Sequence, residues 1–201
     1  TNLKINTLMN IEDFIYKKNV FSSEFCDDIV NIVGKDDLLW SPHTWYDPDT
    51  RESQSKRGEG DYRELEVFYP DKLHTFISRA MMPVLAELCK DYCDTYNFEP
   101  GSFVSRVFPL RFNRYQPGSE MRKHYDHIKS LFSEPVQGIP TLTILGSLNS
   151  DYEGGELILF DDYNINMEKG DVVIFPSNFM YPHRVEKVTK GTRYSFVTWS
   201  S

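Results

Sequence analysis

The second half of the chain alternates short apolar runs with turn residues. From Val104 onward these runs are bounded by Gly, Pro and Asn, a pattern typical of an all-β sandwich or barrel. We expect strands near residues 104–115, 121–126, 141–148, 156–160, 171–175, 181–187 and 192–199.

The first half predicts one strand and two helices. Residues 11–21 fit a strand that enters the domain. Ser22 or Ser23 is a suitable N-cap, and Gly34 a suitable end, for a helix on the outside of the sheet. A longer helix is predicted over residues 73–96, where Pro83 should kink or divide it. Its apolar stripe, which we assign to the core, is Leu73, Phe76, Ala80, Met81, Leu85, Leu88 and Tyr92.

Residues 41–64 are polar and lack periodicity. We interpret them as a long loop, either a mobile surface segment or a lid over a substrate. His43 and His74 have no partner pattern and are interpreted as surface or capped histidines.

Composition narrows the class of protein. At 201 residues the length fits a single domain, with residues 1–103 supporting a core formed by 104–199. The net charge of −8 argues against nucleic acid as a partner. No apolar run approaches 18 residues and the start has no signal-like pattern, so we expect no membrane span. The opening Thr1 suggests a processed chain or part of a longer one.

Three cysteines are too few for a disulfide scaffold. Cys89 and Cys93 share one face of the predicted long helix, where we interpret them as small buried hydrophobes. We therefore expect a reducing, cytoplasmic setting.

The strongest chemical signal begins at His124-Tyr125-Asp126. On an extended backbone, residues i and i+2 point to the same face, so His124 and Asp126 can converge while Tyr125 points away. Two histidines and one carboxylate with open positions are the mark of non-haem Fe(II) sites. The pair alone is weak evidence, because the same spacing also occurs in surface turns.

A third ligand is available near the C-terminus. His183 follows Asp126 by 57 positions (183 − 126), as in a site gathered from distant strands. Arg193 begins the last predicted strand, on the same face as Ser195, Val197 and Trp199. A buried arginine needs an anion, and its planar donor fork suits a carboxylate.

This order of residues resembles the Fe(II)/2-oxoglutarate-dependent dioxygenases. The segments Phe112–Tyr115, Tyr152–Leu157 and Pro182–Val185 narrow the resemblance to the prolyl-4-hydroxylase superfamily, nearest to PKHD-type and oxygen-sensing prolyl hydroxylases. The resemblance covers about residues 105 to 199. It implies a mainly β fold, a double-stranded β-helix (jelly roll) with N-terminal helices packed outside.

The resemblance also implies roles for individual residues. Iron would be held by His124, Asp126 and His183, and the distal carboxylate of 2-oxoglutarate by Arg193. Tyr115 stands where relatives carry a tyrosine that reaches the cosubstrate, and Trp199 would line the same cavity. The alternative role for Tyr115 is that of an aromatic side chain that fills the interior of the barrel.

Two residues complicate this assignment. His127 is a rival to His124 as a ligand, but residues i and i+1 diverge on an extended chain, so pleat geometry favours His124. Ser147 stands where many relatives have a tyrosine that helps the arginine hold the cosubstrate. Either the pocket is roomier here, or another side chain compensates.

The expected activity is hydroxylation of a C–H bond. The reaction would need Fe(II), consume 2-oxoglutarate and O2, and release succinate and CO2 as co-products. Ascorbate is a candidate reductant. By resemblance the substrate is a prolyl residue in a peptide or protein, with a free amino acid or other small molecule as the alternative. Two other classes stay open: a zinc-type hydrolase on the same three ligands, and a jelly-roll binding module without turnover.

Overall fold

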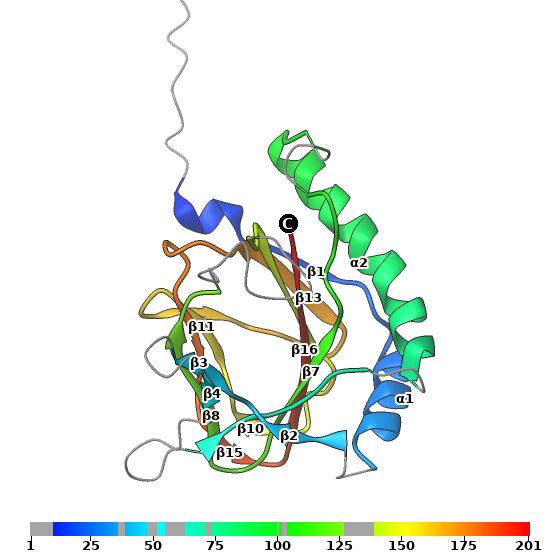
Figure 1. The fold of residues 1–201 in the computed structure, drawn as a ribbon, viewed down its shortest axis with the longest axis vertical. Coiled ribbons are helices and arrows are strands. Elements are labelled where there is room, and N and C mark those ends of the chain that lie inside the picture. Colours follow the sequence, from blue (N-terminus) through cyan, green and yellow to red (C-terminus); the bar gives the residue numbers. More distant parts are fainter. Residues whose placement is uncertain are drawn as a thin grey trace, which may run out of the picture.

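The structure is a computed structural model that describes residues 10–35, 39–47, 52–54, 63–70, 74–99, 101, 104–126 and 139–201, without the side chains of 45–47 and 52–54. Within these residues the chain forms two main sheets that face each other, with two α-helices on one side (Figure 1). A short 3-10 helix, η1 (Ile11–Phe14), leads into the first strand.

The larger sheet contains seven strands among the described residues, and all of its neighbouring strands are antiparallel. Its strands β9, β16 and β7 lie at the centre and carry most of the inner face. In spatial order the sheet is β1 (Tyr16–Asn19), β13 (Asp171–Pro176), β9 (Leu142–Ser147), β16 (Arg193–Ser200), β7 (Arg111–Tyr115), β6 (Glu66–Phe68) and β2 (Ser41–Pro42).

The smaller sheet faces the inner side of the larger one. Among the described residues it has five strands, of which β5 and β8 are parallel and the others antiparallel. Its order is β12 (Tyr163–Ile165), β11 (Leu157–Leu159), β14 (His183–Val185), β8 (Ser119–His124) and β5 (Arg63–Glu64). Two two-stranded sheets complete the strands among the described residues: β10 (Glu153–Gly154) with β15 (Val188–Lys190), and β3 (Trp45–Asp47) with β4 (Glu52–Gln54).

Residue alternation on the larger sheet separates two cores. On β13, Val172 and Ile174 belong to the cluster that includes the helices, whereas Val173 and Phe175 belong to the cluster between the sheets. Successive side chains of a strand point to opposite faces, so one sheet seals both cores. Polar residues on the inner face are therefore buried between the two sheets, where each needs a hydrogen-bond partner.

Helix α1 (Ser23–Val33) matches the sequence prediction. Ser22 is its N-cap, with a hydroxyl that accepts a hydrogen bond from the Phe25 amide at 3.2 Å, and Gly34 follows its last turn. Cys26 and Ile29 are buried and place the helix on the outer face of the larger sheet, as predicted.

Helix α2 (Thr75–Tyr96) runs without interruption through Pro83. The expectation that Pro83 divides the helix is therefore wrong, and the alternative, a kink at Pro83, stays a prediction. Proline removes the hydrogen bond to the carbonyl four residues earlier. Here both Pro83 and Arg79 are exposed, and water can satisfy that carbonyl. The predicted stripe also needs correction, since Phe76 and Ala80 are exposed and Ile77 is buried instead; Leu73 lies outside the described residues.

The cysteines behave as predicted. Cys89 and Cys93 are buried on α2 and free, and burial raises the pKa of the Cys89 thiol to about 12. Within the described part of the chain, neither helix combines the length and the hydropathy needed to cross a membrane.

The seven strands predicted from residue 104 onward correspond to β7, β8, β9, β11, β13, β14 and β16. The first begins only at Arg111, later than predicted. The interpretation of residues 41–64 as irregular is wrong where β2, β3, β4 and β5 lie. Strands of two or three residues are too short to show a period of two, and their hydrogen bonds come from distant partners such as β6 and β8.

Candidate metal centre

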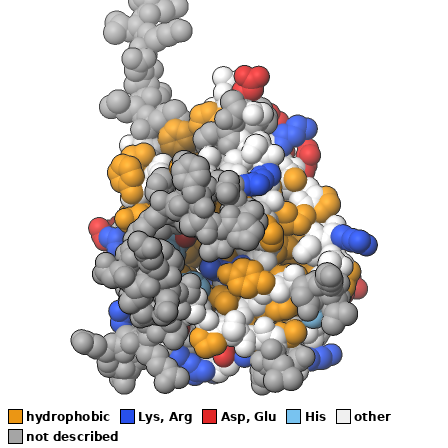
Figure 2. All heavy atoms as spheres, in the orientation of Figure 1, with side chains coloured by type: hydrophobic (Ala, Val, Ile, Leu, Met, Phe, Trp, Pro, Cys, Tyr) orange, Lys and Arg blue, Asp and Glu red, His pale blue; other side chains and the backbone are white. Residues whose placement is uncertain are grey.

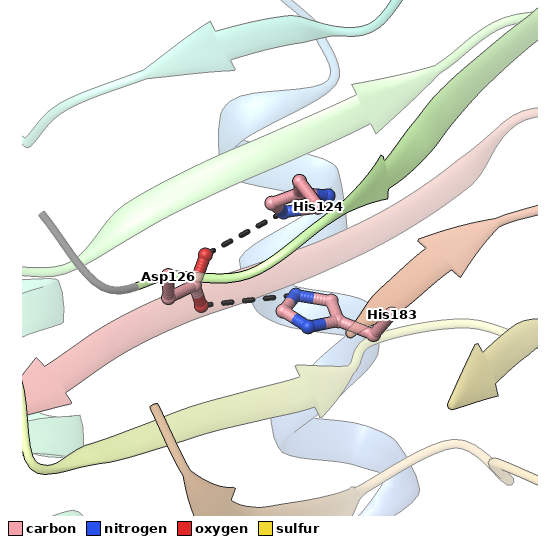
Figure 3. A group of neighbouring side chains, drawn as sticks. All are labelled: His124, Asp126 and His183. Atoms are coloured by element: carbon pink, nitrogen blue, oxygen red, sulfur yellow. Dashed lines mark ion pairs between the residues drawn. The ribbon is translucent and has the colours of Figure 1, made fainter. Parts of the chain in front are cut away.

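Three predicted ligands converge at one end of the smaller sheet. β8 ends at His124, β14 begins at His183, and the two residues are directly paired in the sheet register. Figure 3 shows both rings directed toward the Asp126 carboxylate. One ligand atom from each residue lies within 4.8 Å of the others. Tyr125, between the first two, is 54% exposed and points away, as the pleat requires.

The distances suit a small cation between the three side chains. His124 Nε2 lies 3.5 Å from Asp126 Oδ1, and His183 Nε2 lies 3.7 Å from Asp126 Oδ2. The two imidazole centroids are 4.3 Å apart. Each His Nδ1 faces a backbone carbonyl oxygen, of Arg122 at 2.7 Å and of Tyr181 at 3.1 Å. A proton on Nδ1 donates to that carbonyl and leaves the lone pair of Nε2 for a metal.

The Asp126 carboxylate is oriented by two donors from the larger sheet. Trp199 Nε1 and Thr143 Oγ1 each donate to Oδ2 at 2.9 Å. The Thr143 hydroxyl also lies 2.8 Å from the hydroxyl of buried Ser177. Thr143 and Ser177 were not found from the sequence, because an inward hydroxyl on a strand looks like any other Thr or Ser.

The protonation states of Asp126 and His183 suit the binding of a divalent metal. Burial alone would raise the pKa of the Asp126 carboxyl, but the two imidazoles and the Trp199 hydrogen bond hold its pKa well below the usual range. Burial is the main reason that the pKa of His183 falls to about 4. At neutral pH the site therefore offers an ionised carboxylate and a neutral imidazole, the forms that bind metal.

Arg193 lies further inside the sandwich with 4% of its surface exposed. Its Nη1 donates to Ser195 Oγ at 3.0 Å, while its buried Nε has no hydrogen-bond partner among the described residues. The guanidinium carbon is 5.0 Å from the ring centroid of Tyr115 and 6.0 Å from that of Tyr152. A buried cation with an unused donor fits the carboxylate of a bound dicarboxylate.

A cavity of about 510 Å³ reaches Arg193 from the side of Tyr152. Gly155 lies in its wall, and a Cβ there would be 3.0 Å from Arg193 Cδ and 2.9 Å from Val188 Cγ2. With its φ of +70°, the position favours glycine on both conformational and steric grounds. The Gly-Gly segment thus lets the backbone approach the arginine closely.

Ser147 is fully buried on β9, opposite Ser195 of β16. Its hydroxyl donates to the carbonyl of Asn149 at 3.1 Å. The Ser147 hydroxyl is therefore already hydrogen-bonded to the backbone. Tyr115 and Tyr152 are the tyrosines whose rings stand near Arg193 in the described residues.

Two other histidine predictions have different outcomes. His127 lies outside the described residues, so its rivalry with His124 stays untested. His43 is 7% exposed, with Nδ1 3.8 Å from Glu64 Oε2, so its interpretation as a surface histidine is wrong. The error has a physical cause: its partner is brought in by tertiary folding, 21 positions along the chain (64 − 43).

Comparison with known proteins agrees with this geometry. Residues 110–201 match the family model described as the 2OG-Fe(II) oxygenase superfamily. A PKHD-type hydroxylase of Delftia acidovorans is 35% identical over 111 residues, which are 51% of this chain and 47% of that protein. A PKHD-type hydroxylase of Psychrobacter is 33% identical over 122 residues, covering 57% and 46%. The chain thus spans about half the length of the curated relatives it matches.

Solved structures share the fold over nearly the whole chain. A Pseudomonas putida prolyl-4-hydroxylase superposes with a TM-score of 0.67 at 16% identity, covering 92% of this chain and 91% of that one. A Trichoplax adhaerens prolyl hydroxylase, solved with a hypoxia-inducible-factor peptide fragment, gives the same TM-score and identity and covers 92% and 82%. These similarities confirm the predicted jelly-roll fold. Over residues 110–201, the chain is similar to the 2OG-Fe(II) oxygenase superfamily.

Proposed function

We propose that this chain is an Fe(II)- and 2-oxoglutarate-dependent dioxygenase that hydroxylates a C–H bond and releases succinate and CO2. The observation that carries the proposal is a His-Asp-His cluster together with a buried arginine that has an unused donor, both between the two sheets. Similarity to the 2OG-Fe(II) oxygenase superfamily supports Fe(II), 2-oxoglutarate and O2 as cofactor and cosubstrates, and the three ligands fit iron.

His124, Asp126 and His183 are the proposed iron ligands. Three ligands from one side leave coordination positions for a cosubstrate and for O2. Iron and 2-oxoglutarate together supply the oxidising chemistry, while the protein orients them and excludes water. Trp199 and Thr143 fix the Asp126 carboxylate, so it needs little reorganisation on metal binding.

Arg193 is the proposed anchor for the distal carboxylate of 2-oxoglutarate. Its Nε donor and its low exposure support this role. Tyr115 lies beside the guanidinium and is proposed to contact the cosubstrate as well. The contact seen for Trp199 is with Asp126, and a further contact with 2-oxoglutarate stays a prediction. A zinc hydrolase on the same ligands would have no use for Arg193.

The proposed substrate is a prolyl residue of a peptide or protein, with a free amino acid or other small molecule as the alternative. Support comes from the PKHD-type relatives and from the prolyl hydroxylases that share the fold, one of them solved with a peptide. The use of ascorbate as reductant stays a prediction.

Succinate formation tests the activity. The purified protein should convert 2-oxoglutarate to succinate only when Fe(II) and O2 are both present. His183→Ala should abolish both iron binding and succinate, because a ligand is removed. His74→Ala is the matched control, since that ring packs against Phe68 rather than the cluster. Undiminished iron affinity in His183→Ala would refute the ligand assignment, and zinc-dependent hydrolysis without succinate would favour the hydrolase.

A further inference from the structure

A second arginine stands on the inner face of the larger sheet. Arg111 begins β7 and shares its face with Asn113 and Tyr115. Its Nε donates to Asn113 Oδ1 at 3.1 Å, and its guanidinium carbon lies 5.2 Å from the ring centroid of Trp199. Among the described residues, no carboxylate lies within ion-pair distance of Arg111. Arg111 is half-buried, and the hydrogen bond from its Nε is the one that the structure shows for its side chain among the described residues.

Arg111 borders a cavity of about 420 Å³, a size common for small-molecule sites. On the face shown in Figure 2, basic and histidine side chains lie in a hollow beside hydrophobic ones. Arg111 is the only Lys, Arg, Asp or Glu among the described residues that line the cavity. The lining is Ser41, Pro42, His43, Thr44, Val67, Tyr69 and Arg111.

The neighbouring titratable groups leave the charge of Arg111 available. Burial is the main cause that lowers the pKa of His43, so this imidazole adds no charge at neutral pH. The Glu64 carboxylate is 6% exposed and faces His43 Nδ1 at 3.8 Å. The cavity therefore presents one permanent cation, hydroxyl groups and an apolar wall. These features suit a molecule with a carboxylate and an apolar body.

Contacts connect this cavity to the metal ligands. The guanidinium of Arg111 stacks on Trp199, and Trp199 donates to Asp126. A molecule bound to Arg111 thus lies one side chain away from the ligand set.

Arg111 and Arg193 mark opposite ends of the same strand pair. In the β7–β16 register, Arg111 is opposite Val197 and Arg193 is opposite Tyr115. Four residues of strand separate the two positions, a distance of about 13 Å at 3.3 Å per residue. The guanidinium of Arg193 lies over the Tyr115 ring, whereas that of Arg111 lies over the Trp199 ring. The two cations therefore define two separate carboxylate sites.

We propose that Arg111 binds a carboxylate of the primary substrate and so places an acid group near the oxidised C–H bond. The carboxylate belongs either to a free amino acid or to an acidic residue of a peptide. This inference rests on the proposed function, because the cavity serves the reaction only if iron and 2-oxoglutarate bind beside it.

The test compares acids with amides that cannot pair with arginine. The anaerobic complex of the protein with Fe(II) and 2-oxoglutarate is titrated calorimetrically with the L-amino acids, L-proline first, and with their amides. A second arm uses acetyl-prolyl-aspartate amide against its asparagine counterpart. At least one acid should bind about 100-fold more tightly than its amide, as expected for a bidentate charged pair. The arm in which the preference appears identifies the source of the carboxylate.

Arg111→Gln should abolish the preference for the acid over its amide. The visible charge-transfer band that reports the bound Fe(II)–2-oxoglutarate complex should persist in this variant. Arg106→Gln is the matched control, because Arg106 also stacks on an aromatic ring, Phe108, but lies outside the cavity. Equal binding of acids and amides in both arms would overturn the proposal. So would loss of the band in Arg111→Gln, which would assign Arg111 to the metal or cosubstrate. Absence of the band in the wild type would instead refute the proposed function.

Discussion

Replacement of Trp199 by phenylalanine tests how the metal ligands are held. The change removes one of two hydrogen bonds to Asp126 Oδ2, both of 2.9 Å, and keeps an aromatic ring beneath Arg111. The second donor, Thr143, remains. The Asp126 side chain is 11% exposed, so water cannot freely replace the lost donor.

The expected loss of Fe(II) affinity in Trp199→Phe follows from the negative charge of the Asp126 carboxylate, which accepts the hydrogen bond. A hydrogen bond to a charged group contributes about 1.5–3 kcal/mol. Because Thr143 still donates to the same oxygen, we expect the lower end, which corresponds to about tenfold weaker Fe(II) binding. Thr143→Val should have a similar effect, and the double variant should lose about 100-fold.

Anaerobic competition with a chelator measures the Fe(II) affinity of each variant. Trp40→Phe is the control, because the Nε1 of Trp40 donates instead to the carbonyl of Val33 at 2.8 Å, on the helix side of the sheet. That variant should lose stability and keep its iron affinity. Unchanged iron affinity in Trp199→Phe, or an equal loss in Trp40→Phe, would refute the reasoning.

Three further predictions concern the support around the site. Gly146→Ala should lower the free energy of unfolding by about 1–3 kcal/mol, because its Cβ would lie 2.1 Å from the Phe196 ring; an unchanged melting temperature would contradict this, and iron affinity should persist. Iodoacetamide at pH 8 should not label Cys89 in the folded protein, because a thiol with a pKa of about 12 stays protonated there; labelling that mass spectrometry detects before unfolding would show that the thiol is accessible. Ser147→Ala should change the 2-oxoglutarate concentration for half-maximal succinate formation by less than about threefold, because its hydroxyl donates to backbone; a much larger change would place that hydroxyl in the cosubstrate site.

The features that sequence predicted best have a strong local signal. The helix cap at Ser22 and the central strands follow residue patterns that local geometry enforces. The convergence of His124 and Asp126 could be predicted from pleat geometry, and the addition of His183 came from the order of motifs. Their proximity is now a property of the structure, while their role as iron ligands stays a prediction.

What sequence could not predict depends on tertiary contacts. The hydroxyl of Thr143 becomes a donor to Asp126 only because β9 lies across the sandwich from the end of β8. His43 is buried because β2 and β5 are brought together by β6, β7 and β8 rather than by any local pattern. Pro83 is tolerated in α2 because the carbonyl it leaves unbonded is on an exposed face.

The central claim is that three side chains bind iron between the two sheets and that Arg193 binds 2-oxoglutarate. Anaerobic titration of the Fe(II)-loaded protein with 2-oxoglutarate tests it directly through the visible charge-transfer band of the bidentate complex. We predict a saturable band in the wild type and a requirement for about 100-fold more 2-oxoglutarate in Arg193→Ala, since a bidentate charged pair is lost. No band at any concentration of 2-oxoglutarate, with iron still bound, would contradict the account.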